Sequence, residues 1–385
     1  MSKLYYSNEH EMLIKMVKDF AKNEIRPISL EIDKSEKFPK KIIDKMSELG
    51  LMGIPIPEEY NGIGMDTVGY VAAIIELAKE DASIAITMAA HTSLGAYPIL
   101  IAGNKKQKEK YLPFLASGEI IGAFGLTEPQ AGSDAGSTKT TAIKKDDNYI
   151  INGGKIFITN AGEAKIITIT SRIIHNDNDM GIGAFIVPID TPGLKIGPKE
   201  KKMGWRASDT RQIFFENMEV KADSLLGDPG KGFKTFLKTL TAGRISIAAL
   251  SVGTAIGAYN RALKYANQRK AFNKKIAEFQ SIGFKLADMA TQIEAAKQLT
   301  LHAAWLKDNQ YDFIKEAAMA KLFASETAMK VAIEAIQIHG GYGYVREYDV
   351  ERFFRDAKIL EIGEGSSEIQ RIIISRKILS ELDNL

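Results

Sequence analysis

The feature of this sequence that most constrains its fold is the spacing of its apolar residues, which changes twice along the chain. Up to about residue 120 apolar side chains recur at helical spacing, from 121 to 230 they follow a period near two, and after Gly232 the helical spacing returns. Gly, Asp and Asn separate the short β-rich runs in the middle, and no helix of any length fits between them. The pattern therefore predicts an α+β chain whose middle part is an antiparallel, barrel-like sheet and not a βαβ unit.

These changes divide the chain into predicted domains. Residues 1–120 form an N-terminal all-α domain, 121–230 a middle antiparallel β-barrel-like domain, and 231–385 a C-terminal four-helix bundle. The expected strands include Tyr149–Ile151, Ile156–Thr159, Ile166–Thr170, Ala184–Val187 and Ile213–Phe215. The long helices of the bundle are expected from Gly232 to about 267, and then over 275–307, 312–338 and 366–382.

The composition limits the chemistry that the chain can perform. It contains no cysteine, which excludes disulfides, thiolate metal sites, cysteine-ligated iron–sulfur clusters and a cysteine nucleophile. Redox chemistry would therefore depend on a bound organic cofactor, and we expect no metal site. With 51 basic and 48 acidic residues, the net charge of +3 gives no reason to expect nucleic acid as a partner.

One stretch, Ala82 to Ala102, carries no formal charge over about the length that spans a bilayer. It contains His91, Gly95 and Pro98 and is rich in Ala, Ser and Thr, so we expect a buried core helix and no membrane association. The N-terminus lacks the apolar core of a signal peptide, and acidic residues follow soon after it. We therefore expect a cytoplasmic protein.

Glu364 stands out because it lies between Gly363 and Gly365, just where a helix is expected to begin. Glycines on both sides allow positive φ angles and close approach of a ligand, and Ser366 or Ser367 can cap the following helix. This setting predicts an exposed carboxylate that is aimed into a cavity. The alternative is that Glu364 is an acidic residue near a helix N-terminus, where negative charge is favourable in any case.

Motifs upstream give this glutamate a context. Phe124–Asp134 has the sequence FGLTEPQAGSD, Lys155–Gly162 has the sequence KIFITNAG, and further motifs follow at Gln268–Phe272, Gln337–Gly343 and Arg355–Lys358. With these motifs in order, the chain resembles the acyl-CoA dehydrogenases nearly end to end, and most nearly the short-chain, butyryl-type members. The resemblance implies the acyl-CoA dehydrogenase fold, an oxidoreductase and flavoprotein of fatty acid β-oxidation and lipid metabolism, and a homotetramer built as a dimer of dimers.

The reaction that the resemblance implies is the FAD-dependent α,β-dehydrogenation of an acyl-CoA to the trans-2-enoyl-CoA. Glu364 would abstract the α proton while a hydride leaves the β carbon for flavin N5, and an electron-transfer flavoprotein would accept the electrons. The backbone N–H of the base and a ribityl hydroxyl of the flavin would hold the enolate oxygen. Some relatives place the base on the first long C-terminal helix, where this chain has Gly243, and Glu361 lacks the flanking glycines, so Glu364 is the expected base.

The same resemblance assigns the residues that bind FAD. The residues expected on the flavin side are Phe124, Leu126, Thr127, Ser133, Phe157 and Thr159. The residues expected to reach the pyrophosphate and adenine side from a neighbouring subunit are Arg269, Phe272, Gln280, Gln337, Gly340 and Gly341, and Ser366 and Glu368 are assigned to the same cofactor. Taken alone, the first loop could be an ordinary turn and Arg269 a surface charge at a helix end. A nicotinamide site at Gly340–Gly343 is not expected, because a helix precedes these glycines where a strand is required.

For the acyl-CoA substrate, the resemblance assigns contacts to Ser133, Thr241, Arg244 and Gly365. Ala85 stands where glutaryl-CoA enzymes hold an arginine, so a dicarboxylic substrate is disfavoured. Small residues at Ala89, Ala90 and Gly363 favour more space around a short- to medium-chain, possibly branched, acyl group. The competing interpretations are an O₂-using acyl-CoA oxidase or flavin monooxygenase of the same fold, and a non-catalytic helical assembly protein.

Overall fold

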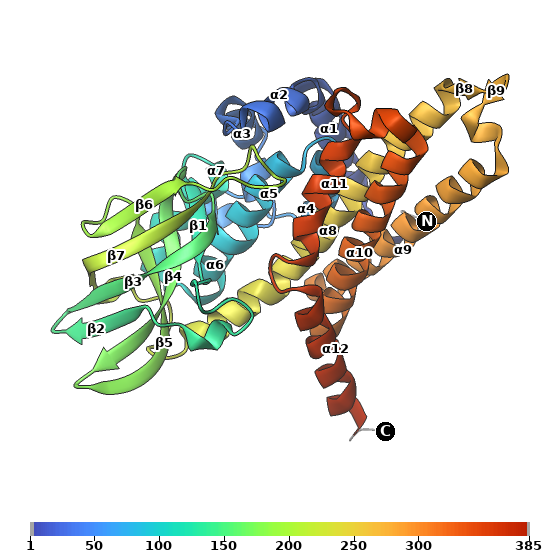
Figure 1. Ribbon diagram of the computed structural model, residues 1–385. Helices are drawn as coiled ribbons and strands as arrows, with labels where there is room; N and C mark the ends of the chain where they lie inside the picture. The colour runs from blue at the N-terminus through green and yellow to red at the C-terminus, as the bar shows by residue number, and fades with distance from the viewer. Residues whose placement is uncertain (1–3, 383–385) are drawn as a thin grey trace.

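The computed structural model describes residues 4–382, with a curved sheet at one side of the molecule and a bundle of long helices at the other (Figure 1). The N-terminal helices connect the two, because α4 and α5 contact α8 of the bundle and α5 also contacts β1 of the sheet. These helices are α1 (Asn8–Phe20), α2 (Ser29–Ser35), α3 (Lys40–Glu48), α4 (Thr67–Ala78), α5 (Ala82–Ala90), α6 (Tyr97–Ala102) and α7 (Lys105–Ser117).

Helices α4 and α5 form the centre of the core, and every residue of both is buried. Each begins at an aspartate cap: Asp66 accepts a hydrogen bond from the Gly69 N–H at 2.8 Å, and Asp81 accepts one from the Ile84 N–H at 3.0 Å. The stretch Ala82–Ala102 and helix α8 are each long and apolar enough to span a membrane, but 83% of the most apolar window of each is buried inside the protein. The first stretch is therefore a core segment, as expected, although a π-helical turn at His91–Ala96 divides it.

The middle part of the chain forms a seven-stranded sheet in the order β1-β4-β2-β3-β7-β6, with β5 paired to β4. Its strands are β1 (Ile121–Gly125), β2 (Thr141–Lys145), β3 (Asn148–Thr159), β4 (Ala164–His175), β5 (Asn178–Pro188), β6 (Leu194–Lys199) and β7 (Thr210–Lys221). Most neighbours are antiparallel, as predicted, but β1 and β2 both pair with β4 in parallel. The two runs expected at 149–151 and 156–159 are one strand, β3, whose register shifts on both sides of Gly153 and Gly154 absorb the break in the pattern.

The C-terminal helices are α8 (Gly232–Gln268), α9 (Gln280–Asp308), α10 (Ile314–His339), α11 (Val350–Lys358) and α12 (Ser367–Glu381). Helix α9 begins at 280 and not at 275, because a small hairpin of β8 (Lys270–Ala271) and β9 (Lys274–Lys275) and a 3₁₀ turn precede it. The short helix α11 was not expected. It leads directly to the Glu364 loop and therefore helps to position that residue.

Candidate active site

The loop that carries Glu364 joins the 3₁₀ turn at Ile359–Glu361 to α12. Glu364 itself has φ +51° and Gly365 has φ +92°, whereas Gly363 keeps a negative φ and donates its N–H to the Ile359 carbonyl at 2.8 Å. A positive φ at a non-glycine residue costs about 1–3 kcal/mol and is maintained only where the surroundings enforce it. The expectation that the flanking glycines supply the unusual backbone is therefore right for Gly365 and wrong for Gly363, and the strain falls on the glutamate.

Glu364 is half-buried as a residue, and one oxygen of its carboxylate is packed against the helix bundle. Its Oε2 is buried with no hydrogen-bond partner in the described part of the chain, and it lies against Gly243 of α8, where a Cβ would overlap it. Burial raises the pKa of Glu364 to about 7, while the charges of Lys321 and Arg244 draw it down. An unpartnered, desolvated carboxylate with a pKa near neutrality has the properties of a general base. The alternative carboxylate, Glu361, instead forms an ion pair with Lys358 Nζ at 2.6 Å.

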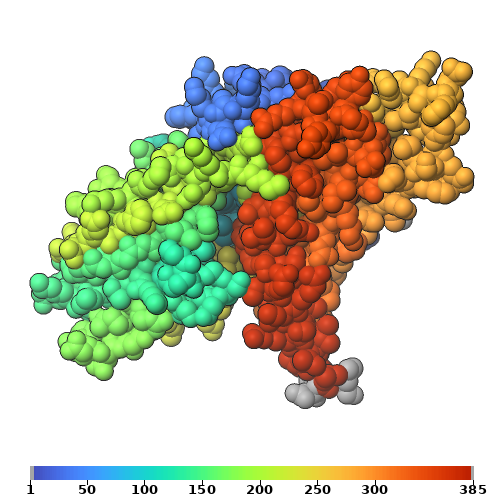
Figure 2. All heavy atoms as spheres, viewed as in Figure 1, coloured from blue at the N-terminus to red at the C-terminus, as the bar shows by residue number. Residues whose placement is uncertain are grey.

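The two motifs expected on the flavin side lie next to each other. The Thr127 carbonyl accepts a hydrogen bond from the Ile156 N–H at 2.9 Å, which joins the loop after β1 to strand β3. Phe124 is buried and stacks on Phe236 with ring centroids 4.2 Å apart, and Leu126 is also buried. On the molecular face shown in Figure 2, the surface is hollowed between the middle part of the chain and the C-terminal helices.

Behind the first motif is a buried ion pair that the sequence motifs did not predict. Lys155 Nζ donates to Glu128 Oε1 at 2.7 Å, and the Glu128 carboxylate also accepts from the Lys139 N–H at 2.7 Å and the Thr140 N–H at 3.1 Å. Burial alone would raise the pKa of Glu128, but the Lys155 charge lowers it to about 2. The pair therefore stays ionised near neutral pH and holds the loop from residue 127 to 140 in shape.

Other residues of these motifs are open to solvent. Phe157 is 64% exposed and has φ +58°, at a point where the register between β3 and β7 shifts. Its ring therefore projects out of the sheet, while Thr159 on the same strand is half-buried. Ser133 is exposed and the neighbouring Gly132 has no atom within 4 Å of a Cβ built on it. These exposed groups are free to meet a ligand.

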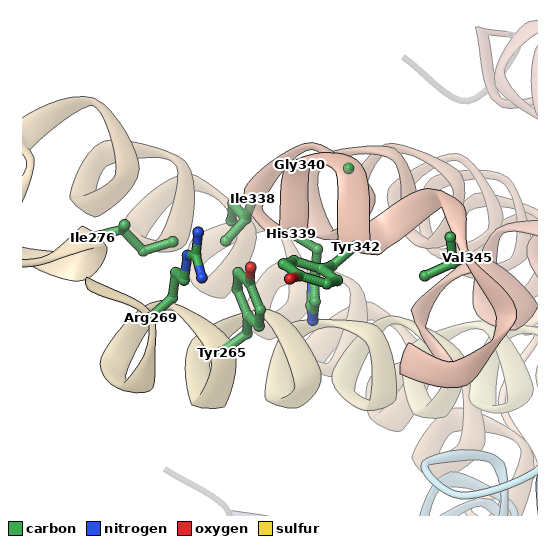
Figure 3. Close-up of a pocket in the computed structure, with 9 residues that line it drawn as sticks. Tyr265, Arg269, Ile276, Ile338, His339, Gly340, Tyr342 and Val345 are labelled. Carbon is green, nitrogen blue, oxygen red and sulfur yellow. The ribbon is translucent and has the colours of Figure 1, made fainter. Parts of the chain in front are cut away.

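A second group of predicted residues surrounds a hollow of about 560 Å³ at the far end of α8 and α10, remote from the sheet (Figures 1 and 3). Arg269, Gly340 and Gly341 line it, and the Arg269 guanidinium lies 5.7 Å from the ring centroid of Tyr342. Gly340 has φ +59°, and neither glycine has an atom within 4 Å of an added Cβ. The motifs missed the aromatic lining, although Tyr265 lies one helical turn before Arg269 and Tyr342 lies within the glycine run.

The remaining residues assigned to this group lie on the surface. Phe272 is 89% exposed and meets Phe279 edge to face at 6.1 Å between centroids, and Gln280 and Gln337 are also exposed. The structure of one chain therefore places Arg269 and the two glycines together. It leaves Phe272 and the two glutamines without a common cavity.

The residues around the start of α12 differ in part from expectation. Ser366 occupies the N-cap position, but its side chain makes no capping hydrogen bond; its carbonyl accepts the Gln370 N–H at 3.0 Å. Glu368 is exposed, and a hydrogen bond from the Ser366 side chain lowers its pKa. The expectation of a serine side-chain cap at Ser366 is therefore wrong, because that hydroxyl is directed to Glu368.

Two of the residues assigned to the substrate, Thr241 and Arg244, bind each other on α8. The Thr241 hydroxyl donates to the Leu237 carbonyl at 2.9 Å and accepts from Arg244 Nη1 at 3.1 Å, while Arg244 Nε is buried without a partner in the part of the chain that the structure describes. Ala85, Ala89 and Ala90 are buried in α5. A Cβ added to Gly363 would meet only Ile359, at 3.4 Å from its carbonyl oxygen.

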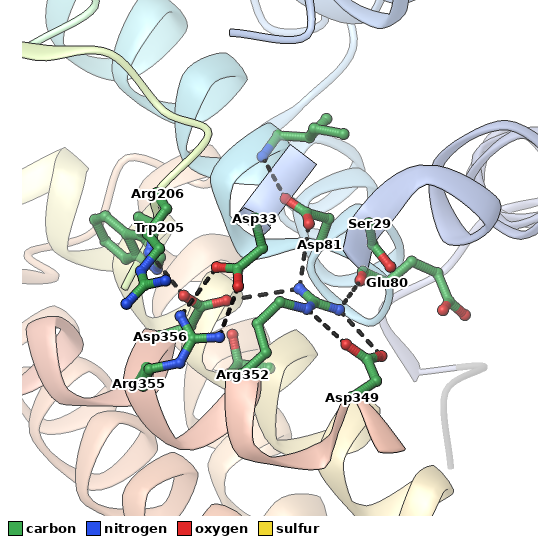
Figure 4. Close-up of polar contacts among 12 residues, drawn as sticks. Ser29, Asp33, Glu80, Asp81, Trp205, Arg206, Asp349, Arg352, Arg355 and Asp356 are labelled. Carbon is green, nitrogen blue, oxygen red and sulfur yellow. Dashed lines mark hydrogen bonds and ion pairs between the residues drawn. The ribbon is translucent and has the colours of Figure 1, made fainter. Parts of the chain in front are cut away.

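Helix α11, which precedes the Glu364 loop, is fixed by a buried network of charges (Figure 4). Arg352 donates to Asp349 at 2.7 Å and to Asp81 at 3.2 Å. Arg355 binds Asp33 of α2 at 2.7 Å. Asp356 accepts the Trp205 N–H at 2.7 Å, and burial raises the pKa of Asp356 to about 7. The network ties the segment before Glu364 to the N-terminal helices and to the middle domain.

Comparison with known proteins agrees with this architecture. The family models named Acyl-CoA dehydrogenase N-terminal, middle and C-terminal domain match residues 7–119, 123–218 and 230–379. The chain is 54% identical over 374 residues to a probable acyl-CoA dehydrogenase of Bacillus subtilis, covering 97% of this chain and 98% of the relative. It is 46% identical over 372 residues to the short-chain specific acyl-CoA dehydrogenase of Clostridium acetobutylicum, covering 97% and 98%.

Solved structures are similar over the same length. Butyryl-CoA dehydrogenase from Megasphaera elsdenii superposes with a TM-score of 0.95 at 44% identity, covering 97% of this chain and 99% of the other. A chain in a structure of the electron transferring flavoprotein of Acidaminococcus fermentans gives a TM-score of 0.95 at 45% identity, with 97% and 98% coverage. An acyl-CoA dehydrogenase from Bacillus anthracis complexed with FAD gives 0.93 at 36% identity, with 98% and 68% coverage.

The helical, sheet and helical-bundle parts, together with matches along nearly the whole chain, define the class of protein: this chain belongs to the acyl-CoA dehydrogenase family and is an oxidoreductase. Among its relatives are the short-chain and butyryl-type enzymes, which confirms the resemblance inferred from the motifs.

Proposed function

We propose that this chain is an FAD-dependent dehydrogenase that converts a short-chain acyl-CoA to the trans-2-enoyl-CoA and passes the electrons to an electron-transfer flavoprotein. The proposal is supported by similarity to short-chain specific and butyryl-CoA dehydrogenases, to an FAD complex, and to a chain in a structure of an electron transferring flavoprotein. The observation that carries it is the Glu364 carboxyl group. Its Oε2 is buried against Gly243, and burial raises the pKa of the group to about 7.

The residues present fit FAD. Within residues 4–382 Arg269 makes no ion pair, and beside it Gly340 and Gly341 present bare backbone to an open hollow, which suits a pyrophosphate group. Phe157 offers an exposed flat ring, and Thr127 and Thr159 of the same two motifs are half-buried threonines. When bound, FAD supplies the acceptor for the hydride that leaves the β carbon of the substrate.

Glu364 takes the α proton in this proposal. Its Oε2 has no competing donor, and its backbone N–H donates to no acceptor in the described part of the chain, so that this N–H is available to the thioester oxygen. Walls of buried apolar atoms exclude water from the carboxylate and keep its proton affinity high. The chain thus provides both a base and an oxyanion donor from a single residue.

The separation of the two predicted cofactor groups supports an assembly of more than one subunit, for which we propose the homotetramer implied by the family resemblance. The helix from residue 243 to 269 is roughly 40 Å long, which is farther than one FAD molecule extends. The flavin-side residues of one chain and Arg269 can therefore serve the same cofactor only if they come from different subunits. Exposed apolar side chains on α12 and the hairpin region, including Phe272, Ile378 and Leu379, are consistent with such an assembly.

The proposed substrate is a straight or branched short acyl chain, and the room at Gly363 supports a branched one. The test is anaerobic bleaching of the flavin absorbance by butyryl-CoA, isobutyryl-CoA and hexanoyl-CoA. Wild-type protein is expected to bleach with at least one of them, and Glu364→Gln is expected to bleach about 10²- to 10⁴-fold more slowly with FAD retained. Bleaching of that variant at the wild-type rate would contradict the assignment of the base, and stoichiometric hydrogen peroxide in air would favour an oxidase.

A further inference from the structure

Lys321 is a buried lysine whose charge acts on the Glu364 carboxylate, yet it belongs to none of the motifs. It lies on α10 with no exposed surface, among buried alanines of that helix. Its Nζ donates a hydrogen bond to the carbonyl of Gly365 at 2.8 Å. Gly365 directly follows Glu364, so this bond fixes the peptide next to the strained residue.

The same carbonyl has a second donor, which is neutral. Gln370 on α12 is fully buried, and its Nε2 donates to the Gly365 carbonyl at 2.8 Å and approaches the Glu364 carbonyl at 3.5 Å. One helix therefore supplies a charged donor and another an uncharged one. This pairing allows the effect of charge to be separated from the effect of a hydrogen bond.

The charged and titratable groups around Glu364 come from several elements. Arg244 of α8 and Lys321 of α10 act on the carboxylate as positive charges, and Tyr70 of α4 faces it as a neutral phenol. Glu361 and Glu368, which flank the loop, act on Lys321. Neither cation forms an ion pair with Glu364 within the described residues, so each acts through space and leaves the carboxylate free of a direct partner.

We propose that Lys321 is a positioning residue for the reaction: its ammonium holds the Gly365 carbonyl, and with it the backbone of Glu364, while its charge keeps the carboxylate ionised without touching it. The inference rests on the function proposed above. A direct salt bridge would occupy the oxygen that must take the proton. A cation bound to the next carbonyl avoids this conflict and still stabilises the carboxylate.

The test compares two donors in the FAD-loaded enzyme, with the pH dependence of flavin reduction as the readout. Lys321→Met is expected to move the pH midpoint upward by about one unit, and to slow reduction about tenfold at pH below the midpoint. Gln370→Met is expected to slow reduction at all pH values and to leave the midpoint unchanged, because it removes a hydrogen bond but no charge. Lys307→Met serves as the control, since Lys307 is a half-buried lysine whose pKa burial also lowers, but it binds the Thr67 hydroxyl at 2.8 Å, away from the loop.

A second measurement does not depend on turnover. Burial lowers the pKa of Lys321 to about 8 and raises that of Glu364 to about 7, so the measurement is made between these values. In thermal unfolding at about pH 7.5, Lys321→Met is expected to lower Tm more in wild type than in the Glu364→Gln background, because in that background the lysine has no carboxylate charge to stabilise. Equal loss in both backgrounds, together with an unchanged midpoint, would show a purely structural lysine and overturn the inference. If no acyl-CoA reduces the flavin of the wild-type enzyme, the proposed function fails, whereas the coupling measured by unfolding still tests the inference. If Lys321→Met does not fold, Lys321→Gln removes the charge with a smaller change in volume and decides the same point.

Discussion

The Glu364 loop and the Arg269 hollow are built on the same two helices, α8 and α10, but they differ in how complete they are within one chain. At one end the buried oxygen of the Glu364 carboxylate lies against Gly243, and the charges of Arg244 and Lys321 act on it from within the same chain. At the other end Arg269 and the bare backbone of Gly340 and Gly341 stand open to solvent. Under the proposed function, one chain would complete the proton-transfer site alone, whereas the proposed phosphate-binding groups would need a second subunit.

The largest effect is expected for Gly243→Ala, because the enclosed site should not tolerate one added methyl group. A Cβ there would overlap Glu364 Oε2 and displace the carboxylate, and a displacement of about 1 Å can cost 10²-fold in rate. The rate of flavin reduction should fall by about that factor with FAD content unchanged. Gly283→Ala on α9, where an added Cβ meets only Ala277 at 3.9 Å, should keep the wild-type rate.

The enclosure also predicts a pH dependence. Because burial raises the pKa of Glu364 to about 7, the carboxyl is protonated below that pH and cannot accept a proton. Flavin reduction should therefore increase with pH to a plateau above about 7, and fall about tenfold for each unit below it. Stopped-flow measurements at constant FAD occupancy would check this. A rate that stays flat down to about pH 5 would mean that the base is less buried than the structure shows.

The open site should respond to Arg269→Ala in the opposite way, with binding affected and chemistry preserved. Loss of a charge-assisted contact of about 1.5–3 kcal/mol should weaken FAD retention by at least about tenfold and reduce assembly. Fully loaded variant should keep the wild-type rate of flavin reduction. FAD titration and light scattering would measure both effects, with the neighbouring exposed Lys270→Ala as a control. Unchanged size and unchanged FAD affinity would contradict a shared site.

The smallest effect is expected from Gly363→Tyr, next to the Glu364 carboxylate in sequence. The position has open space beyond Ile359 and a negative φ, so that a side chain fits without backbone strain. Filling it should move kcat/KM by about fivefold toward straight-chain butyryl-CoA and away from a branched substrate, since apolar volume discriminates by about 1–3 kcal/mol. An unchanged ratio in steady-state kinetics would mean that Gly363 does not shape the acyl pocket.

Much of the architecture was predictable because apolar period and motif order are local properties. The α+β class, the family and the enzyme class follow from them and are confirmed. The residues that hold the sites in place were not predictable. Lys321 and Glu364, and likewise Lys155 and Glu128, are brought together only by tertiary packing, and nothing in the sequence around a lysine shows which distant carbonyl or carboxylate it will meet.

The role of individual site residues remains a prediction for a related physical reason. Phe272, Gln280 and Gln337 are exposed on one chain, so that their contacts would be formed only with other molecules. In the Glu364 loop, residue type alone did not predict which residues have a positive φ. The sequence suggested that both glycines carry the positive φ, but the tertiary network places it on Glu364 and Gly365.

The arginine network of α11 limits where this chain can be cut into fragments or recombined with a relative. Arg352 and Arg355 reach Asp81 and Asp33 of the N-terminal helices, and Asp356 reaches Trp205 of the middle domain, all within a short helix that ends just before the base loop. Removing the first hundred residues would leave several buried charges without partners, at a cost of about 3–5 kcal/mol for each broken pair. A C-terminal fragment containing Glu364 would therefore not inherit its geometry, and recombination between relatives must exchange these interacting segments together.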